Sequence, residues 1–591
     1  MTRFKLETFT ISTFFSINLI LIKYFTTDRF SLFLSIVSCM LLCYLVLSNF
    51  PIGVLYFCTT MCASLLMSYL GFRGIFSTIF ISLAGVLSYL VARTKAGEWQ
   101  LRFERFSNIL KVFGILALFT VLQYGGSIWG TTISRLRSNL LSYDLISHSY
   151  ITRLIAICDG KILDCQKVPQ SLSSNQYINT YPDSFHLFFG GIFRGSLITT
   201  VDSYLMSWSI LVACSFILLV SFLVSGVSFL QARGVFGVKI KQQGILDPLL
   251  DPATLILIGV AIIYPFNLGY MNFSYAIVFV LLSAILATER FFLISMMLLI
   301  IACELWSFLY LVTPFLAIHF FIESYRARKK TSMAVLVIYL LLTFKFLFTA
   351  LESDQAKSAT LSSTHVIEPI LVLGFSVYAL MKIKSSELNS FYAALRVAII
   401  STSMSLFAML SYLAIFKGSI GSYYGFKISI LLFCLNLLAI IQSVRDITFT
   451  FKVKKSTLLN LLLVIALVFW FIPGAVISKV ASAKSMIVSP ASIAYSRVYK
   501  IDEYAWRAST ILNSSKRCKE QTPCVLLEPT YWYQSTHWIN NINLSWTSNL
   551  QSAMDYVAAE KGTTSQNVKE LAKKFETRDI EIVGTFTRVE K

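Results

Sequence analysis

Apolar runs of 15–22 residues recur along most of this chain, and they constrain its fold more than any other feature. A run of about 20 apolar residues forms a helix long enough to cross the hydrocarbon core of a bilayer. The composition agrees: 56% of the 591 residues are hydrophobic and 14% are charged, whereas soluble domains have about 45–50% and about 25%. The chain is therefore predicted to be an α-helical polytopic membrane protein.

About fifteen spans are expected, beginning near residues 10, 30, 52, 74, 107, 203, 253, 273, 291, 306, 332, 369, 392, 428 and 457. The first apolar run, Ile11 to Tyr24, is followed so closely by others that we interpret it as a retained helix rather than a secretory signal. Amino-acid patterning alone thus predicts the number and the position of the membrane helices.

The basic residues predict the orientation of the chain. The formal net charge is +20, and cytoplasmic loops of membrane proteins are enriched in lysine and arginine. A cytoplasmic N-terminus places most basic residues of the short loops inside, and the opposite orientation inverts that bias. The basic residues are dispersed among loops instead of forming one face, which argues against nucleic-acid binding.

Two long polar segments, 126–202 and 477–591, fall on the outer side in this orientation. The predicted organisation is a transmembrane domain over 1–476, which includes the outer loop 126–202, and an extracytoplasmic α/β domain over 477–591. Within the loop, apolar residues at helical spacing from Thr132 to Ile157 predict one amphipathic helix along the membrane face. In the tail we expect a helix from Asp502 to Leu512, one or two helices from Leu550 to Phe575, and strands at Cys524–Leu527 and Ile580–Thr585.

The cysteines give an independent indication of the same topology. Seven of the eleven lie in or next to apolar runs, where cysteine is an ordinary small hydrophobic residue. The other four form two close pairs, Cys158 with Cys165 and Cys518 with Cys524. Both pairs lie in segments assigned to the outside, where disulfides persist. Metal binding is the alternative, but neither pair has the spacing of a zinc site.

The polar loop carries the first group of candidate site residues. Asp144 and His148 are four residues apart and share a face if the segment is helical, with Arg153 beyond them. Asp144 is a candidate general base for a hydroxyl nucleophile, and His148 and Arg153 are candidate ligands of phosphate oxygens. The alternative is a surface pair on a solvated helix, which spacing alone favours.

A second group follows in the same loop. Tyr181 and Pro182 precede Asp183 and His186, which are three residues apart at the entrance to an apolar stretch. This pattern is typical either of a loop that contacts a lipid phosphate or a sugar, or of a helix N-terminus with Asp183 near the cap. A metal site formed by the two histidines and these acids has weak support.

Three further places carry ionisable or aromatic residues at predicted span ends. Tyr424 and Lys427 lie at the outer end of the span that begins near 428, where Lys427 either pairs with a phosphate or anchors the interface. Glu304 and Lys345 are ionisable groups in apolar surroundings, which indicates a polar cavity or side chains that reach the interface. We assign no role to His319 or His365.

Together, these residues resemble the GT-C superfamily of polytopic membrane glycosyltransferases, in particular its large actinobacterial-type members. The matching elements are Tyr143-Asp144 with His148 and Arg153, the Tyr181-Pro182 and Phe185-His186 element, Glu503–Trp506 leading to Cys524–Leu527, and more weakly Tyr423–Lys427. Many GT-C enzymes carry the acid in the first outer loop, often as an acidic pair. Here it lies in the third outer loop after Tyr143, which leaves the subtype and a divalent cation open.

The resemblance implies transfer of a sugar, with inversion, from a polyprenyl-phosphate donor to a cell-envelope glycan or lipid acceptor on the outer face of the cell membrane. The resemblance also implies that Asp144 is the general base and that the reaction belongs to polysaccharide biosynthesis. No nucleotide-binding glycine motif is present, so no nucleotide cofactor is expected. A polysaccharide polymerase or ligase is the second interpretation. A flippase for a lipid-linked glycan is the third, although the internal repeats typical of transporters are not seen.

Overall fold

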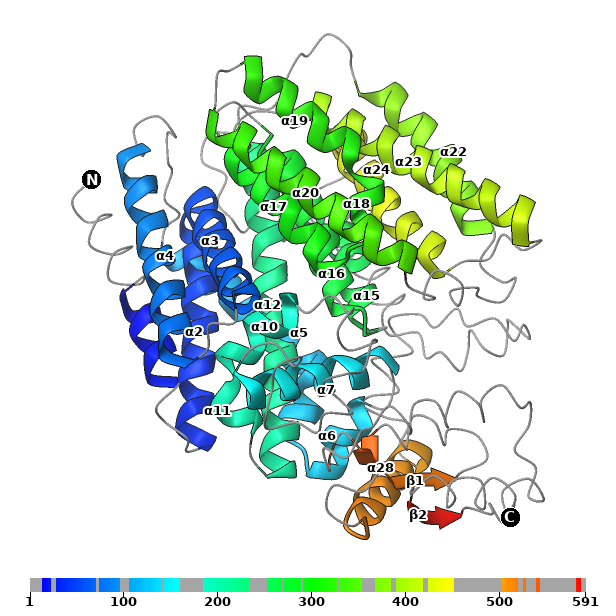
Figure 1. The fold of residues 1–591 in the computed structure, drawn as a ribbon. Coiled ribbons are helices and arrows are strands. Elements are labelled where there is room, and N and C mark those ends of the chain that lie inside the picture. Colours follow the sequence, from blue (N-terminus) through cyan, green and yellow to red (C-terminus); the bar gives the residue numbers. More distant parts are fainter. Residues whose placement is uncertain are drawn as a thin grey trace.

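The structure is a computed structural model of the 591-residue chain. It describes residues 13–22, 28–70, 74–95, 106–139, 143–159, 184–198, 200–232, 252–267, 269–287, 291–326, 330–352, 367–383, 390–417, 423–450, 502–518, 524–527, 538–540, 542 and 581–585. Helices dominate these residues, and two short strands lie near the C-terminal end (Figure 1).

Helices lie where the apolar runs predict them. Those that precede the polar loop are α2 (Asp28–Ser48), α3 (Phe50–Tyr69), α4 (Gly74–Lys95) and α5 (Phe106–Ile128). Those that follow it are α12 (Val201–Ala232), α14 (Pro252–Ile258), η1 (Gly259–Ile263), α15 (Tyr264–Asn267), α16 (Met271–Ile285), α17 (Phe292–Leu305), α18 (Leu309–Val312), α19 (Pro314–Arg326), α20 (Lys330–Glu352), α22 (Ile367–Lys382), α23 (Ser390–Lys417) and α24 (Tyr423–Thr450). The fifteenth expected span, near 457, lies outside the described residues.

Four of the described helices are long and apolar enough to cross a membrane: Arg29–Ser48, Phe50–Met67, Val201–Ala232 and Ser390–Ile415. Nine shorter apolar helices of 10–17 residues accompany them. Large apolar side chains also project outward from the peripheral helices, including Leu87 of α4, Leu341 of α20 and Phe407 of α23. Exposed apolar surface on this scale is typical of contact with lipid. The fold is thus that of a helical membrane protein, and the count of about fifteen spans stays a prediction.

The chain departs from the expected regular spans around Glu304. Helix α17 ends at Trp306, whose φ of −144° and ψ of 90° are extended. After the four-residue α18, Pro314 begins α19, because a proline lacks only an N–H that the first turn of a helix leaves unbonded. The two spans expected here are therefore interrupted by a corner that carries Trp306 and Phe308.

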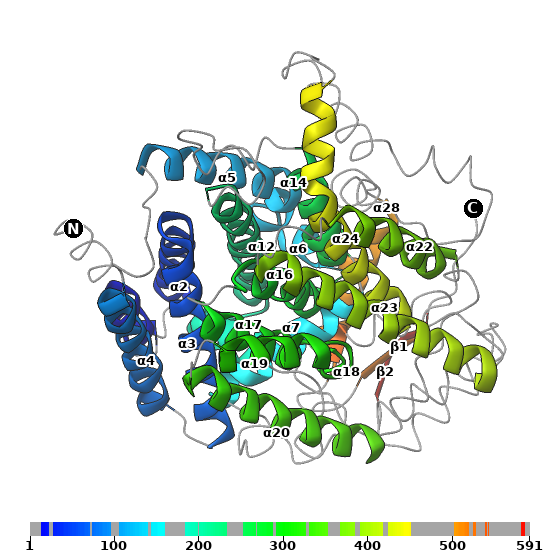
Figure 2. The same ribbon diagram turned by 90° about the horizontal axis from the view of Figure 1, so that it is seen from above.

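The core of the molecule surrounds α12 and α16. All fifteen residues of α16 are buried, and α12 packs against α2, α5 and α16. Figure 2 shows these two helices near the middle, with α2–α4 on one side and α22–α24 on the other. Phe57 of α3 contacts the rings of Phe188, Phe222 and Phe279 at 5.0–5.5 Å. These aromatic contacts join the first helices to the centre of the bundle.

The polar loop forms short helices: α6 (Thr132–Asn139), α7 (Tyr143–Cys158), α10 (Ser184–Ile192) and α11 (Arg194–Leu197). The prediction of one continuous helix from Thr132 to Ile157 is wrong, because α6 ends at Asn139. The Asn139 amide bonds the Arg135 carbonyl at 2.7 Å and accepts from Trp208 at 3.1 Å, and such side-chain bonds compete with helix continuation. The expected surface location is also wrong, since α7 is buried at every residue from His148 to Ala156.

The tail contributes α28 (Asp502–Ser515) and the strands β1 (Cys524–Leu527) and β2 (Glu581–Thr585). The strands pair in parallel, with Cys524 opposite Glu581. In Figure 1 these elements lie next to α6, at one end of the molecule, and α28 packs against α6. The helices expected over 550–575 lie outside the described residues, and an independent C-terminal domain stays a prediction.

Candidate functional site

Two histidines from different parts of the polar loop meet inside the molecule. His148 lies on α7 and His186 on α10, and these two helices pack side by side. Nδ1 of His148 lies 3.2 Å from Nε2 of His186. The hydroxyl of Thr152, one turn after His148, lies 3.0 Å from Nδ1 of His186. A cluster of three polar side chains thus forms at the contact between α7 and α10.

The hydrogen bonds of Thr152 fix the protonation pattern of this cluster. The hydroxyl donates its only proton to the His148 carbonyl at 2.7 Å, because a carbonyl can only accept. The hydroxyl must then accept from Nδ1–H of His186. A neutral His186 therefore has an unprotonated Nε2, to which Nδ1–H of His148 donates. It follows that Nε2 of neutral His148 is also an acceptor.

Burial keeps both rings neutral. His148 is 2% exposed and His186 is 0% exposed. Burial, with a smaller contribution from the positive charge of Lys427, lowers the pKa of His148 from 6.5 to about 3. Burial and the neighbouring His148 lower the pKa of His186 well below its usual value. The pair is therefore uncharged at neutral pH, and negative charge placed beside it would raise the pKa of both rings.

We expect the stability of the protein to fall as the pH drops below 6.5. The unfolded chain binds a proton at each histidine near pH 6.5, whereas folded His148 resists protonation down to about pH 3. The free energy of unfolding is therefore highest above pH 6.5 and falls as the pH drops from 6.5 toward 3. The loss is up to about 1.4 kcal/mol per pH unit for each histidine. Thermal unfolding of the detergent-solubilised protein measures it. A His148→Gln variant should show a shallower pH dependence, and an unchanged slope would contradict the protonation pattern.

Lys427 reaches this cluster from the other end of the sequence. It lies in the second turn of α24 and is 7% exposed. Its Nζ sits 4.2 Å from the ring centroid of Tyr270 and 5.4 Å from that of Phe273, within the range of cation–π attraction. Its charge also acts on His148. A lysine nearly 280 residues away in sequence therefore contributes to the electrostatics of the polar loop.

A tight turn delivers Tyr270 to Lys427. Helix α15 ends in a Schellman motif, in which the Tyr270 N–H bonds the Pro265 carbonyl at 2.8 Å and the Gly269 N–H bonds the Phe266 carbonyl at 3.0 Å. Gly269 has a φ of 85°, a left-handed conformation that glycine adopts without a steric cost. The turn allows α16 to start immediately and places Tyr270 and Phe273 beside α24.

Aromatic rings extend the site from Lys427 toward the corner after α17. Trp306 meets Phe273 edge-on at 4.7 Å and stacks on Phe308 at 5.8 Å. Phe308 in turn stacks on Tyr424 at 5.0 Å with an angle of 13°. Phe308 and Tyr424 are partly exposed. The row of rings therefore runs from the buried lysine to accessible surface.

Glu304 borders the site at the same corner. Its carboxylate accepts a hydrogen bond from the Tyr310 hydroxyl at 2.7 Å. Its backbone carbonyl accepts from Ser184, the first residue of α10, at 3.0 Å. The corner after α17 is thus tied directly to the helix that carries His186.

The polar loop holds other candidate site residues besides His148 and His186. Arg153 contacts the Tyr204 ring, with its Cζ 4.3 Å from the centroid, and donates to the Ile542 carbonyl at 3.0 Å. Burial lowers its pKa, which Tyr204 and Tyr150 partly offset. Its role as a phosphate ligand stays a prediction. The backbone of Asp144 lies in the first turn of α7, one turn before His148, while its side chain, like Tyr181 and Asp183, lies outside the described residues.

Both cysteine pairs are represented among the described residues. Cys518 and Cys524 form a disulfide, with their Cα atoms 6.1 Å apart, as proposed from their spacing. Cys158 is disulfide-bonded as well, and Cys165 lies outside the described residues. The seven remaining cysteines described are free and lie in helices.

Several residues of the site were not identified from the sequence. Thr152 is four residues after His148, so helical spacing places it on the same face and could have found it. Tyr270, Phe273 and Phe308 read as ordinary residues of apolar runs. Nothing in the sequence near them indicates contact with α24, because that contact depends on how distant helices pack.

His186 does not offer a nitrogen to a metal ion in this hydrogen-bond pattern. Both ring nitrogens of His186 are engaged, one with Thr152 and the other with His148, and a ligand nitrogen needs an open lone pair. The nearby charge of Lys427 also opposes a second cation. Among the residues that the structure describes, no group of three histidine, cysteine or acidic side chains is arranged to hold a metal. The arrangement suits an anion.

Anion binding is what this geometry can do chemically. It combines a buried ammonium, a neutral histidine pair and a row of aromatic rings. No protein-family model matches the chain, and neither a curated protein nor a solved structure matches it.

Proposed function

We propose that the chain is a membrane glycosyltransferase of the GT-C type. It transfers a sugar from a polyprenyl-phosphate donor to a cell-envelope glycan or lipid acceptor on the outer face. The observation that carries the proposal is the contact between the buried rings of His148 and His186, together with the buried Lys427, whose charge acts on His148. A buried cation at the end of an apolar helix suits a ligand with an anionic head and a hydrocarbon tail.

Lys427 and the histidines have separate tasks in this proposal. The ammonium of Lys427 attracts the donor phosphate and stabilises the negative charge that grows on it as the sugar leaves. His148 has an acceptor nitrogen when it is neutral, and it takes up a proton as the phosphate enters, because the anion offsets the burial that keeps the ring neutral. The imidazolium then donates to a phosphate oxygen.

The transfer itself forms one bond and breaks another. The acceptor hydroxyl oxygen bonds to the anomeric carbon of the sugar, and the bond from that carbon to the phosphate oxygen breaks. The phosphate keeps the electron pair, and Asp144 takes the hydroxyl proton. Attack from the face opposite the leaving phosphate inverts the anomeric carbon.

The row of rings suits the sugar. Flat aromatic faces pack against the C–H surfaces of a pyranose ring, and the partly exposed Tyr424 and Phe308 lie on the accessible side of Lys427. The Glu304 carboxylate, held by Tyr310, is a hydroxyl acceptor at the edge of this row. Donor phosphate, sugar and acceptor would thus be arranged from the buried to the exposed end of the site.

An assay of the purified protein tests the proposal. It is offered a panel of polyprenyl-phosphate sugars, with nucleotide sugars as the comparison, and the glycosylated acceptor is measured. We expect transfer from one or more lipid-phosphate donors and none from nucleotide sugars. His186→Gln should reduce transfer strongly, because the glutamine cannot reproduce the bridge between Thr152 and His148.

His319→Gln is the matched control, because the His319 ring contacts Phe320 on α19 and is not part of the pair. It should retain transfer. Binding of every lipid-linked sugar without transfer, together with movement of the lipid across vesicles, would favour a flippase instead. Linkage of preassembled glycan chains would favour a polymerase or ligase.

A further inference from the structure

The C-terminal part of the chain packs into the core that surrounds the polar loop. Ala508 and Ile511 of α28 are fully buried, as are Trp538 and Ile539, and α28 lies against α6. Helix α6 is in turn fixed to α12 by the ion pair between Arg135 and Asp202 at 2.6 Å. Burial on this scale is typical of a permanent contact and not of a loosely tethered module.

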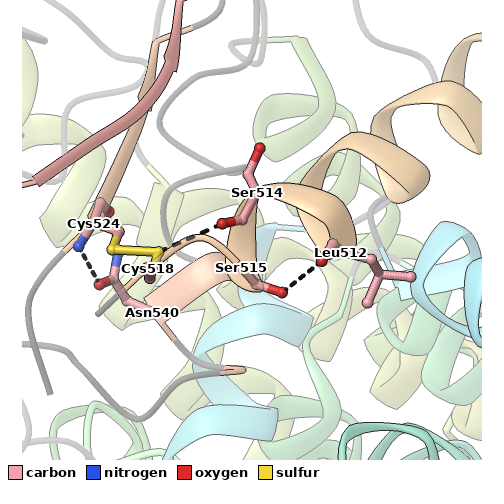
Figure 3. Close-up of a disulfide and its surroundings, with 6 residues drawn as sticks. All are labelled: Leu512, Ser514, Ser515, Cys518, Cys524 and Asn540. Atoms are coloured by element: carbon pink, nitrogen blue, oxygen red, sulfur yellow. Dashed lines mark hydrogen bonds between the residues drawn. A yellow bond between two sulfur atoms is a disulfide. The ribbon is translucent and has the colours of Figure 1, made fainter. Parts of the chain in front are cut away.

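The segment 538–542 is fastened to the strand β1 by one side chain. The Asn540 amide accepts from the Cys524 N–H at 3.0 Å and donates to the Cys524 carbonyl at 2.6 Å. Asn540 thus bonds the backbone of Cys524 as a neighbouring strand would. The disulfide to Cys518 fixes the same residue to the end of α28 (Figure 3).

Arg153 joins the segment 538–542 to α7. Its guanidinium donates to the Ile542 carbonyl and lies on the Tyr204 ring of α12. Both Arg153 and Ile542 are buried, at 5% exposure each, and a hydrogen bond from a charged donor in such surroundings is among the stronger ones. The next residue toward the N-terminus is Thr152, whose hydroxyl holds His186.

We propose that Arg153 is a positioning residue that fastens the segment 538–542 to α7, so that the C-terminal segment holds Thr152 in contact with His186. A change in the position of the segment 538–542 would then move Arg153 and the adjacent Thr152, and so change the contact with His186. The C-terminal segment therefore helps to position the histidine pair. The inference concerns the position of α7 and does not rest on glycosyl transfer.

Hydrogen exchange of the α7 amides in the purified full-length protein tests the coupling. Arg153→Gln weakens the hydrogen bond between α7 and the Ile542 carbonyl. Asn540→Ala removes the hydrogen bonds between the segment 538–542 and β1. Arg153→Gln should speed exchange in α7 by about tenfold, the effect of losing one hydrogen bond from a charged group. Asn540→Ala should have an effect of the same size, because it frees the segment whose carbonyl Arg153 bonds. The double variant should exchange no faster than either single variant, because both changes break the same chain of contacts.

Arg194→Gln is the matched control. Arg194 also bonds an α7 carbonyl, that of Ala156, at 3.2 Å, but it lies on α11 and is not part of the link through Asn540. Its effect on exchange should add to that of Asn540→Ala. Arg153→Lys retains a donor for Ile542 and should recover part of the protection.

A second readout separates positioning from local stability. Asn540→Ala should also make the loss of stability below pH 6.5 shallower, because a loosened α7 admits water to the histidines. Three results would each overturn the proposal. They are exchange of the α7 amides at the wild-type rate in Asn540→Ala, fully additive effects in the double variant, and an unchanged pH dependence of stability in Asn540→Ala. None of these readouts requires transferase activity, so failure of the proposed function would leave them intact.

Discussion

Replacing Asp144 by asparagine is expected to lower sugar transfer by about 10²–10⁴-fold, the range for loss of a general base. The amide has the shape of the carboxylate but cannot take the proton of the acceptor hydroxyl. Asp144 lies one turn before His148 on α7, so helical spacing places the two on the same side of the helix. The measurement is turnover with the donor that the wild-type protein prefers, with donor binding followed in parallel.

Donor binding should survive in Asp144→Asn, because the proposed mechanism assigns the phosphate to Lys427 and the histidines. Asp159→Asn is the matched control: Asp159 follows the other end of α7 and pairs with Arg194 at 3.4 Å. It should retain turnover near the wild-type rate. Full turnover in Asp144→Asn would remove Asp144 from the role of base and leave the proton acceptor to be sought at Glu304.

Replacing Lys427 by methionine is expected to weaken prenyl-phosphate binding by about 10- to 100-fold, the equivalent of one charge-assisted hydrogen bond. Methionine keeps the length of the side chain and packs well on aromatic rings, so the contact with Tyr270 is retained while the charge is lost. Titration of the purified protein with a short-chain prenyl phosphate measures the effect.

The same substitution has a second expected result. Burial and, to a smaller extent, the charge of Lys427 lower the pKa of His148. Replacing Lys427 by methionine should therefore raise that pKa toward 6.5, and the protein should lose stability over a narrower range of pH below 6.5. Lys382→Met is the control, since Lys382 also sits over a tyrosine ring, that of Tyr378 at 5.4 Å, but is exposed on α22. Equal binding by Lys427→Met and Lys382→Met would contradict a phosphate site at Lys427.

The positions of the helices could be predicted from the sequence because membrane helices satisfy their own backbone hydrogen bonds. An apolar run of sufficient length is then enough to predict one, and helices start close to the expected positions from α2 to α24. The prediction failed where a side chain overrides the local pattern. Asn139 bonds the Arg135 carbonyl and ends α6, and the extended Trp306 ends α17.

The site could be predicted only in part. His148, His186 and Lys427 stood out because polar and charged residues are rare in this chain. The structure brings the two histidines into contact and buries Lys427, whose charge acts on His148. The sequence could not show that α7 is enclosed by protein, since its apolar spacing fits an interfacial helix equally well. Nor could it show that Arg153 faces Tyr204 and Ile542, a residue nearly 390 positions away.

The sequence by itself determined the class of the protein: apolar length and sparse charge allow only a helical membrane chain with polar residues gathered in a few segments. The short spacing from Cys518 to Cys524 also predicted the disulfide that the structure contains. The tertiary structure alone decided that His148 meets His186, that the charge of Lys427 acts on His148, and that the tail is bonded to α7. Those contacts depend on the packing of helices far apart in the chain, and local patterns carry no information about which distant faces meet.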